Sequence, residues 1–231
     1  MSVAGGPYIV ENGLVMCLDA ASQLSYPGSG TTWTDVSNSN SNVTLSGSPV
    51  YSSSPGSFTF NSSSYGQTIS GNISLSSATF IAWVYTTQTQ ASYTGIINNR
   101  SGYNGSTALA TSLNFYSNNQ VGYNWNDNPS TWGWASGLSV PLSAWCMVAV
   151  SVTPTSATAY LCQSSGITTA ANSIASSALS NLTFYIAADP YSFGGRTFIG
   201  SISIAYIYNR ALSPLEIQQN YNAQKSRFGL S

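Results

Sequence analysis

The sequence predicts an all-β protein built as a sandwich of two antiparallel sheets. About a dozen short runs are rich in β-branched and aromatic residues, which favour strands. Turn-forming residues separate these runs at the spacing of about 8 to 12 residues that is typical of sandwiches and barrels. A hydrophobic content of 42% in 231 residues is enough for a substantial core. All-β sandwiches of this length often form a single domain, which is the organisation we expect.

The strands are predicted in order from the amino-terminal end. The first covers residues 13–19, whose nearly continuous apolar character indicates burial on both faces or a position next to a covered edge. Residues 168–180 are full of Ala and Ser, which fits a loop or a weak helix, and we expect a loop. The other strands are expected over residues 43–45, 57–61, 67–69, 78–86, 93–98, 113–116, 121–125, 145–152, 157–162, 182–187 and 197–208.

One helix is expected, directly after the last strand. Ser213 is a good N-cap, Pro214 suits the first helical position, and the Glu216 carboxylate can reach back to the cap N–H. Arg210 is expected to anchor the corner before this helix by bonding carbonyls or a carboxylate such as Asp35 or Glu216. The apolar stripe of the helix is expected to consist of Leu215, Ile217 and Tyr221.

The chain divides into three parts. Residues 1–12 are small and polar and form an amino-terminal arm, which either caps an edge of the sandwich or reaches a neighbouring subunit. Residues 13–222 form the sandwich domain, and residues 223–231 form a carboxyl-terminal tail that closure of the sandwich does not require. We expect the arm and the tail to be the first places to look for contacts with a neighbour.

The charge content is unusually low and excludes several functions. Charged residues make up 5% of the chain, against about 25% in an ordinary soluble domain. With five Lys and Arg against six Asp and Glu, the chain lacks the basic patch that nucleic-acid binding requires and a polybasic membrane surface. The longest apolar stretch, residues 145–152, is too short to span a membrane. The amino-terminal end does not resemble a secretory signal, so we expect assembly in a cytoplasm.

Cysteine and histidine limit the possible chemistry further. Cys17, Cys146 and Cys162 match no zinc or redox spacing. Cys146 and Cys162 could face each other across a hairpin, but buried reduced thiols are the expected state. The chain has no His, which excludes Ser-His and Cys-His catalysis within it.

The end of the chain carries a motif formed by residues 208–213, the pair Glu216 and Ile217, and residues 220–223. This motif resembles the C-terminal signature of concanavalin A-like lectin/glucanase domains of the laminin-G-like type. The resemblance implies a jelly-roll sandwich and covers nearly the whole chain. Weaker similarities lie at residues 13–15, 18–20, 60–62, 79–84, 145 and 148–150.

The same family implies a calcium site that this chain has lost. Many members carry acidic residues where this chain has residues 61–65 and 201–204, and those acids help to hold a structural calcium ion. Calcium prefers carboxylate oxygens, so Ser and Asn at these positions weaken or abolish such a site. We expect no metal and no cofactor, with Asp19 and Asp189 as the remaining candidate ligands.

Three further segments are similar to the version of the family found in virion proteins of tailed bacteriophages and cyanophages. They are Asp19 with Ala20, residues 26–35 and residues 225–230. This resemblance implies a particle protein that is assembled in the host cytoplasm without a signal peptide. Its partners would be other virion proteins or copies of itself. A sandwich with few charges cannot protect its sheet edges with Lys, which also favours an assembly.

Residues 122–134 are the best candidate for recognition of a ligand. Flat aromatic rings can stack on sugar faces while Asn and Asp bond sugar hydroxyls, and the low charge suits a neutral glycan. The alternatives are that alternate rings such as Tyr123 and Trp125 pack across strands, or that the rings form a protein interface. The candidate glycan contacts are Tyr123, Trp125, Asp127, Trp132 and Trp134.

A binding function is favoured over an enzymatic one. Glycoside hydrolases need two carboxylates that flank the scissile bond, and no two of the six carboxylates lie within seven residues of one another. We therefore expect a non-enzymatic virion protein, a head decoration or a fibre or tail appendage, with a lectin-like fold that binds glycans. The alternative is a standalone carbohydrate-binding lectin, and a glycoside hydrolase is the third possibility.

Overall fold

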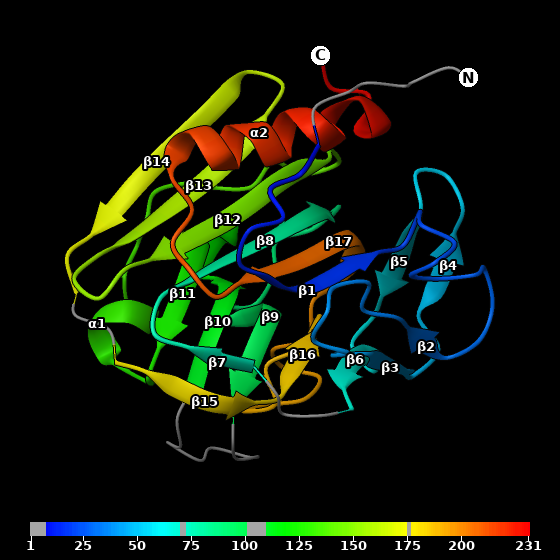
Figure 1. Cartoon of the computed structure of the whole chain (residues 1–231), viewed down its shortest axis with the longest axis horizontal. Coiled ribbons are helices and arrows are strands. Elements are labelled where there is room, and N and C mark those ends of the chain that lie inside the picture. Colours follow the sequence, from blue (N-terminus) through cyan, green and yellow to red (C-terminus); the bar gives the residue numbers. More distant parts are fainter. Residues whose placement is uncertain (1–7, 70–72, 101–109, 175–176) are drawn as a thin grey trace.

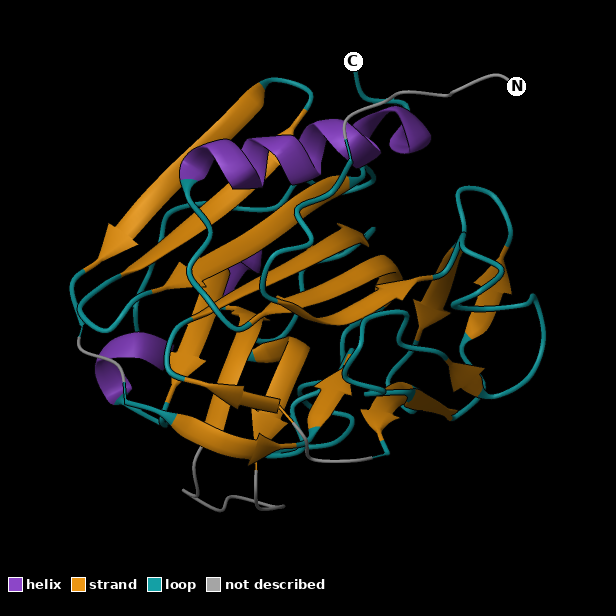
Figure 2. Cartoon of the chain, in the orientation of Figure 1, coloured by secondary structure: helices purple, strands orange, loops and turns teal. Residues whose placement is uncertain are grey.

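The computed structural model describes residues 8–69, 73–100, 110–174 and 177–231. Its two large antiparallel sheets form a sandwich, as predicted, and strands dominate the chain (Figures 1 and 2). Residues 1–7 of the expected arm lie outside the described residues.

The first sheet has eight strands in the order β14-β13-β12-β8-β17-β5-β4, and β1 also pairs with β17. The closing strand β17 therefore joins three neighbours, which explains why the chain cannot complete this sheet until its last quarter is in place. The strands are β1 (Leu14–Asp19), β4 (Val50–Ser52), β5 (Ser57–Phe60), β8 (Ala78–Tyr85), β12 (Cys146–Val152), β13 (Ala157–Gln163), β14 (Gly166–Asn172) and β17 (Gly200–Tyr208).

The second sheet has seven strands in the order β11-β10-β9-β16-β6-β3-β2. A separate pair of strands, β7 and β15, adds apolar side chains to the core. The strands of the second sheet are β2 (Thr32–Trp33), β3 (Val43–Ser46), β6 (Tyr65–Thr68), β9 (Thr94–Arg100), β10 (Ala110–Phe115), β11 (Val121–Trp125) and β16 (Phe184–Ile186), and the separate pair is β7 (Ile73–Leu75) and β15 (Leu179–Leu182).

Strand β8 shows how the core is divided. Successive side chains of a strand point to opposite faces, and Phe80 and Val84 enter the core between the two sheets. Ile81 and Trp83 point to the other face and belong to a second apolar cluster. Helix α2 (Pro214–Gln224) contributes Ile217 to that cluster and lies across the first sheet (Figure 2). Burial on both faces accounts for the nearly continuous apolar sequence of this strand.

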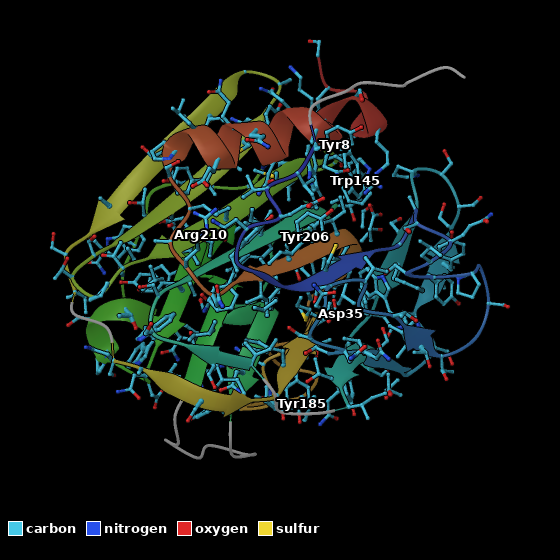
Figure 3. The ribbon with its side chains drawn as sticks, in the orientation of Figure 1. Tyr8, Asp35, Trp145, Tyr185, Tyr206 and Arg210 are labelled. Carbon is cyan, nitrogen blue, oxygen red and sulfur yellow. The ribbon has the colours of Figure 1, made fainter. Side chains whose placement is uncertain are left out.

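Helix α2 begins as predicted. Ser213 accepts from the Glu216 N–H, and the Glu216 carboxylate accepts from the Ser213 N–H, so the capping box is complete. Arg210 bonds the Glu216 carboxylate and, through Nε, the carbonyl of Asn12 at 2.8 Å. The structural roles expected for these three side chains are confirmed, and Figure 3 shows Arg210 on the connection that leads into the helix.

The predicted apolar stripe of α2 is wrong at one position. Leu215 is 76% exposed, because two helical residues differ by about 200° and Ile217 sets the buried face. Asn220 lies on the buried face instead, accepting from the Val10 N–H at 2.7 Å and donating to the Tyr208 hydroxyl at 3.1 Å. None of the helices in the described ranges is long and apolar enough to cross a bilayer.

The tail and the described part of the arm contact the chain's own sandwich. The 3-10 helix η2 (Lys225–Phe228) follows α2, and its Phe228 stacks on Trp83 with ring centres 4.1 Å apart. Arg227 bonds the Asp19 carboxylate at 2.8 Å, and Gln219 donates to the carbonyl of Tyr8 (Figure 3). The tail therefore packs on the first sheet through Arg227 and Phe228, and its contact with a neighbour stays a prediction.

Three other expectations need correction. Residues 168–180 contain most of β14 and the start of β15 rather than a loop, because the β13 ladder supplies hydrogen bonds that the small side chains do not predict. The 182–187 segment contains the end of β15 and the short strand β16. A second helix, α1 (Pro129–Trp132), exists because Asn128 caps it and Pro129 starts it. The cysteines are buried and free, as expected.

Candidate functional site

A pocket of about 190 Å³ opens on the face of the second sheet that points away from the core. Leu113 and Phe115 of β10 enter the core, so the alternating residues Ser112 and Asn114 point to the opposite face. Together with Asn124 of β11 they line the pocket. Its floor is therefore a set of short polar side chains held on rigid strands.

The loop after β16 brings a carboxylate to this floor. Asp189 is buried and accepts from Arg100 Nε at 3.0 Å and from Arg196 Nη1 at 3.2 Å. Its first oxygen also accepts from the Tyr191 N–H at 2.9 Å. Because both oxygens are occupied, Asp189 joins the two arginines and its own loop into one unit, and its role in the site is to hold the other groups in place.

Asp127 is bonded on one side only. Its Oδ1 accepts from Arg100 Nη1 at 3.5 Å and from Asn124 Nδ2 at 3.2 Å. Within the described ranges no hydrogen bond reaches Oδ2, and the side chain keeps 22% of its surface exposed. Asp127 follows β11 with a positive φ of 53°, a conformation that Asp tolerates better than most residues. The turn thus presents one carboxylate oxygen to the pocket.

Aromatic rings form the walls. The Arg196 guanidinium lies 4.1 Å from the ring centre of Tyr191 and 4.8 Å from that of Tyr93. Trp132 of α1 meets Tyr93 edge to face, with ring centres 5.7 Å apart. Tyr93 has a φ of 67°, which is strained for a bulky residue and is a feature often found at functional sites.

Three floor atoms are buried without a hydrogen-bond partner among the residues that the structure describes. They are Oδ1 of Asn114, Oδ1 of Asn124 and Oγ of Ser112. A buried polar atom without a partner costs about 1–3 kcal/mol, so such atoms are rare in native structures and call for a bound group to satisfy them. All three line one pocket, where an ordered water or a polar ligand can supply the missing bonds.

The structure brings two of the five predicted contacts to this pocket, Asp127 and Trp132. Tyr123 and Trp125 are each only 2% exposed and lie in the core. They have no exposed ring face for a ligand, so the predicted glycan contacts of these two residues are wrong. Their rings pack in the core, which agrees with the cross-strand packing alternative. Burial raises the pKa of Tyr123 to about 12, although a hydrogen bond from Asn172 opposes the shift. Trp134 packs against the core and meets Tyr123 edge to face.

The sequence analysis missed Tyr93, Arg100, Tyr191 and Arg196 as parts of a site, and Asp189 entered only as a candidate calcium ligand. They come from segments that lie far apart in the chain. One signal was available: the chain has five basic and six acidic residues, and two of each kind meet in this pocket. The pocket therefore holds a large share of the few charged residues of the chain.

The two candidate calcium ligands both face arginines. Asp19 is bonded by Arg227, and Asp189 by Arg100 and Arg196. Within the ranges that the structure describes, no three His, Cys, Asp or Glu residues come together as a metal site. Both of these carboxylates are therefore used to hold guanidinium groups.

Many solved structures share the fold, including an arabinanase domain and a sialidase. Domain 4 of AbnA, an extracellular GH43 arabinanase from Geobacillus stearothermophilus, was solved in complex with arabinotriose. It matches with a TM-score of 0.67 at 17% identity, over 93% of this chain and 100% of that chain. A Trypanosoma rangeli sialidase in complex with the inhibitor DANA gives 0.65 at 16% identity, over 98% of this chain and 35% of the sialidase. The chain thus spans about a third of the sialidase's length.

Sequence comparison gives the family. No curated protein sequence matches the chain. A family model described as the concanavalin A-like lectin/glucanases superfamily matches residues 60–218, which include the strands of the pocket floor and most of the terminal motif. The chain therefore belongs to the concanavalin A-like lectin/glucanases superfamily, as its motifs predicted.

Proposed function

We propose that this chain is a non-catalytic carbohydrate-binding domain and that the pocket beside Trp132 is its binding site. The observation that carries the proposal is the group of unpaired, buried floor atoms of Ser112, Asn114 and Asn124. Sugar hydroxyls can donate to these oxygens, and an indole ring at the wall offers an apolar surface to a sugar face. AbnA domain 4, which shares the fold, was solved with arabinotriose, and this supports a carbohydrate as the ligand.

The same pocket argues against turnover. Asp127 and Asp189 are 62 positions apart in sequence, but both contact Arg100. The wide spacing of the carboxylates along the chain therefore does not exclude this pair as catalytic groups. Glycoside hydrolysis needs one carboxyl group that delivers a proton and a second that attacks or activates water. Both oxygens of Asp189 accept from arginines, and Arg100 also bonds Asp127. Both Asp189 oxygens are therefore held by arginines, so the Asp127 oxygen that faces the pocket has no second available carboxylate beside it among the described residues.

Calorimetric titration with arabinotriose and a panel of other oligosaccharides tests this proposal. We expect binding of at least one glycan without any hydrolysis products, and a loss of about tenfold or more in affinity for Trp132→Ala, which corresponds to about 1.4 kcal/mol. Tyr8→Ala is the control, because it removes an exposed aromatic ring beside α2, away from the pocket. Failure of every glycan to bind, or equal affinity of Trp132→Ala, would contradict the proposal.

Assembly into a particle is a second candidate function, and strand β14 favours it. The first sheet ends at β14 (Figure 1). This strand keeps a regular register with β13 over seven residues and contains no charge and no Pro. Natural sheet edges usually carry a charged residue or Pro, which hinders pairing with another chain. A virion role, which the resemblance of residues 26–35 and 225–230 implies, would give this edge a partner strand.

Light scattering coupled to size-exclusion chromatography tests the assembly role. We expect a concentration-dependent oligomer, which Thr169→Lys returns to a monomer because it places a charge in the middle of the edge. Ser164→Lys, in the turn before β14, is the matched control. A wild-type chain that stays monomeric at high concentration would remove this second candidate.

A further inference from the structure

We propose that the pocket selects a neutral sugar unit over the corresponding uronic acid, and that Asp127 makes this selection. The inference rests on the proposed carbohydrate-binding function and deepens it. It follows from how the charges in the pocket are paired and from which polar atoms are left for a ligand.

The first step concerns Asp127. Its Oδ1 is held by Arg100 and Asn124, while no hydrogen bond reaches Oδ2 within the described ranges. An ionised carboxylate can only accept hydrogen bonds. Oδ2 therefore suits a hydroxyl group, which donates, and opposes a second carboxylate, which brings a like charge and no donor.

The second step concerns the arginines, which an acidic sugar would need. Arg100 directs Nε and Nη2 to Asp189 and Nη1 to Asp127. Arg196 directs Nη1 to Asp189 and is flanked by the rings of Tyr93 and Tyr191. Strong carboxylate binding uses a guanidinium fork that meets the ligand in two parallel bonds. Here the Arg100 fork is turned toward the chain's own carboxylates and Arg196 gives one N–H to Asp189, so the two positive and two negative charges balance.

The third step concerns the floor. Asn124 donates its Nδ2 to Asp127, and a carboxylate cannot donate in return, so this contact fixes the orientation of the amide. The Oδ1 of Asn124 is the atom left over, and it is buried without a partner. Oδ1 of Asn114 and Oγ of Ser112 are unpaired as well. The floor therefore offers two amide oxygens that accept and one hydroxyl that both accepts and donates, and a ligand rich in hydroxyl groups satisfies all three.

The size of the pocket limits what enters it. A volume of about 190 Å³ is below the range of about 300–1,000 Å³ that is typical of pockets for drug-sized ligands. One sugar ring fits this space better than a buried oligosaccharide. Discrimination therefore acts on the substituents of a single unit, such as a CH₂OH group against a carboxylate.

The experiment uses matched pairs of probes on the full chain. Methyl glucoside and methyl glucuronide form one pair, and methyl galactoside and methyl galacturonide form another. Each pair differs only at C6. We expect at least one pair in which wild-type protein binds the neutral member about tenfold more tightly or better, and a ratio below about threefold for Asp127→Asn. Asn also tolerates a positive φ, so this variant keeps the backbone of the turn.

The control is Glu11→Gln, which removes one exposed carboxylate elsewhere and should leave the ratio unchanged. Thermal melting of all variants shows whether they remain folded. Equal or tighter binding of the uronic acids by wild type would overturn the proposed selection and leave the binding function standing. An unchanged ratio of neutral to acidic sugar affinity in a folded Asp127→Asn would have the same meaning. If neither these probes nor any oligosaccharide of the larger panel binds, the proposed function fails and the selection fails with it.

Discussion

The guanidinium of Arg210 contacts both carboxylate oxygens of Glu216, at 2.6 Å and 3.0 Å. Glu216 also accepts from the Ser213 N–H at 2.8 Å, so one carboxylate joins the corner after β17 to the first turn of α2. These contacts, the Arg210 bonds first and the Ser213 N–H second, lower the pKa of the Glu216 carboxyl from 4.5 to about 2. The stability of the corner and helix that close the sandwich therefore depends on pH through this ion pair.

The first prediction is a pH-dependent loss of stability. Because folding lowers the pKa of Glu216, its contribution is fully present above pH 4.5 and disappears as the pH falls toward 2. The pair is 29% exposed on each side, so solvent screening limits the contribution to about 1 kcal/mol or less. Urea midpoints of wild type and Glu216→Gln should differ at pH 7 and converge near pH 2. Glu11→Gln is the control. The Glu11 carboxylate has no hydrogen bond among the described residues, so the urea midpoint of this variant should equal that of wild type at pH 7.

The second prediction concerns the tail. Phe228 stacks on Trp83 and also meets Trp145 with ring centres 4.9 Å apart. Phe228→Ala should lower the free energy of unfolding by about 3 kcal/mol, the lower end of the range for buried Phe→Ala. Urea denaturation followed by tryptophan fluorescence measures this change. Leu215→Ala is the control and should stay within about 0.5 kcal/mol, because Leu215 is exposed. An unchanged Phe228→Ala would mean that the tail does not stabilise the domain.

The third prediction concerns Asp35, a buried carboxylate that organises the loop before β3. It accepts from the N–H groups of Cys17, Ser37 and Ser41 at 2.8–2.9 Å, and from the Ser37 hydroxyl at 2.9 Å. Asp35→Asn replaces one acceptor oxygen by a donor and leaves buried N–H groups unpaired, at about 1–3 kcal/mol each. We expect a loss of about 3 kcal/mol in urea denaturation. Ser37→Ala is the comparison, because it removes only the hydroxyl bond to Asp35, and it should lower the free energy of unfolding by about 1 kcal/mol. If Asp35→Asn and Ser37→Ala lowered the free energy of unfolding equally, the carboxylate would not be the organising group.

Much of the fold could be predicted because its signals are local. The β-branched and aromatic residues of β8 and the capping box at Ser213 are signals within short segments, and both predictions are confirmed. Strand β14 was missed because its small side chains are half exposed and its hydrogen bonds come from β13, which no local pattern records. Edge strands of this kind depend on pairing more than on composition.

The pocket shows where local patterns stop. In residues 122–134 the alternation identified the strand, but it did not say which face meets the other sheet, and that choice decides which residues are exposed. The rings of Tyr123 and Trp125 took the core face, and Asn124 between them took the pocket. Arg100, Asp189 and their partners meet only through the order of strands in the sheet, so the sequence alone could not place them together.

The last prediction tests whether this placement supports binding. Gly95 of β9 lies so close to the loop after β16 that an added Cβ would overlap the Ala188 carbonyl and come within 2.6 Å of the Asp189 N atom. The Gly95 N–H also donates to the Arg196 carbonyl at 3.1 Å. Gly95→Ala must therefore move the segment that carries Asp189 and Arg196. We expect glycan affinity to fall by about tenfold or more, measured by calorimetry at a temperature where circular dichroism shows a folded chain.

Gly137→Ala provides the matched control for that variant. Gly137 has a φ of 74° and no atom within 4 Å of the position that a Cβ would take, so the substitution adds backbone strain of about 1 kcal/mol or more without touching the pocket. Its melting temperature should fall while its glycan affinity stays at the wild-type value. If Gly95→Ala binds like Gly137→Ala, the Asp189 segment does not set the geometry of the site. A selective loss in Gly95→Ala would instead show that the close approach of β9 to this segment positions both arginines.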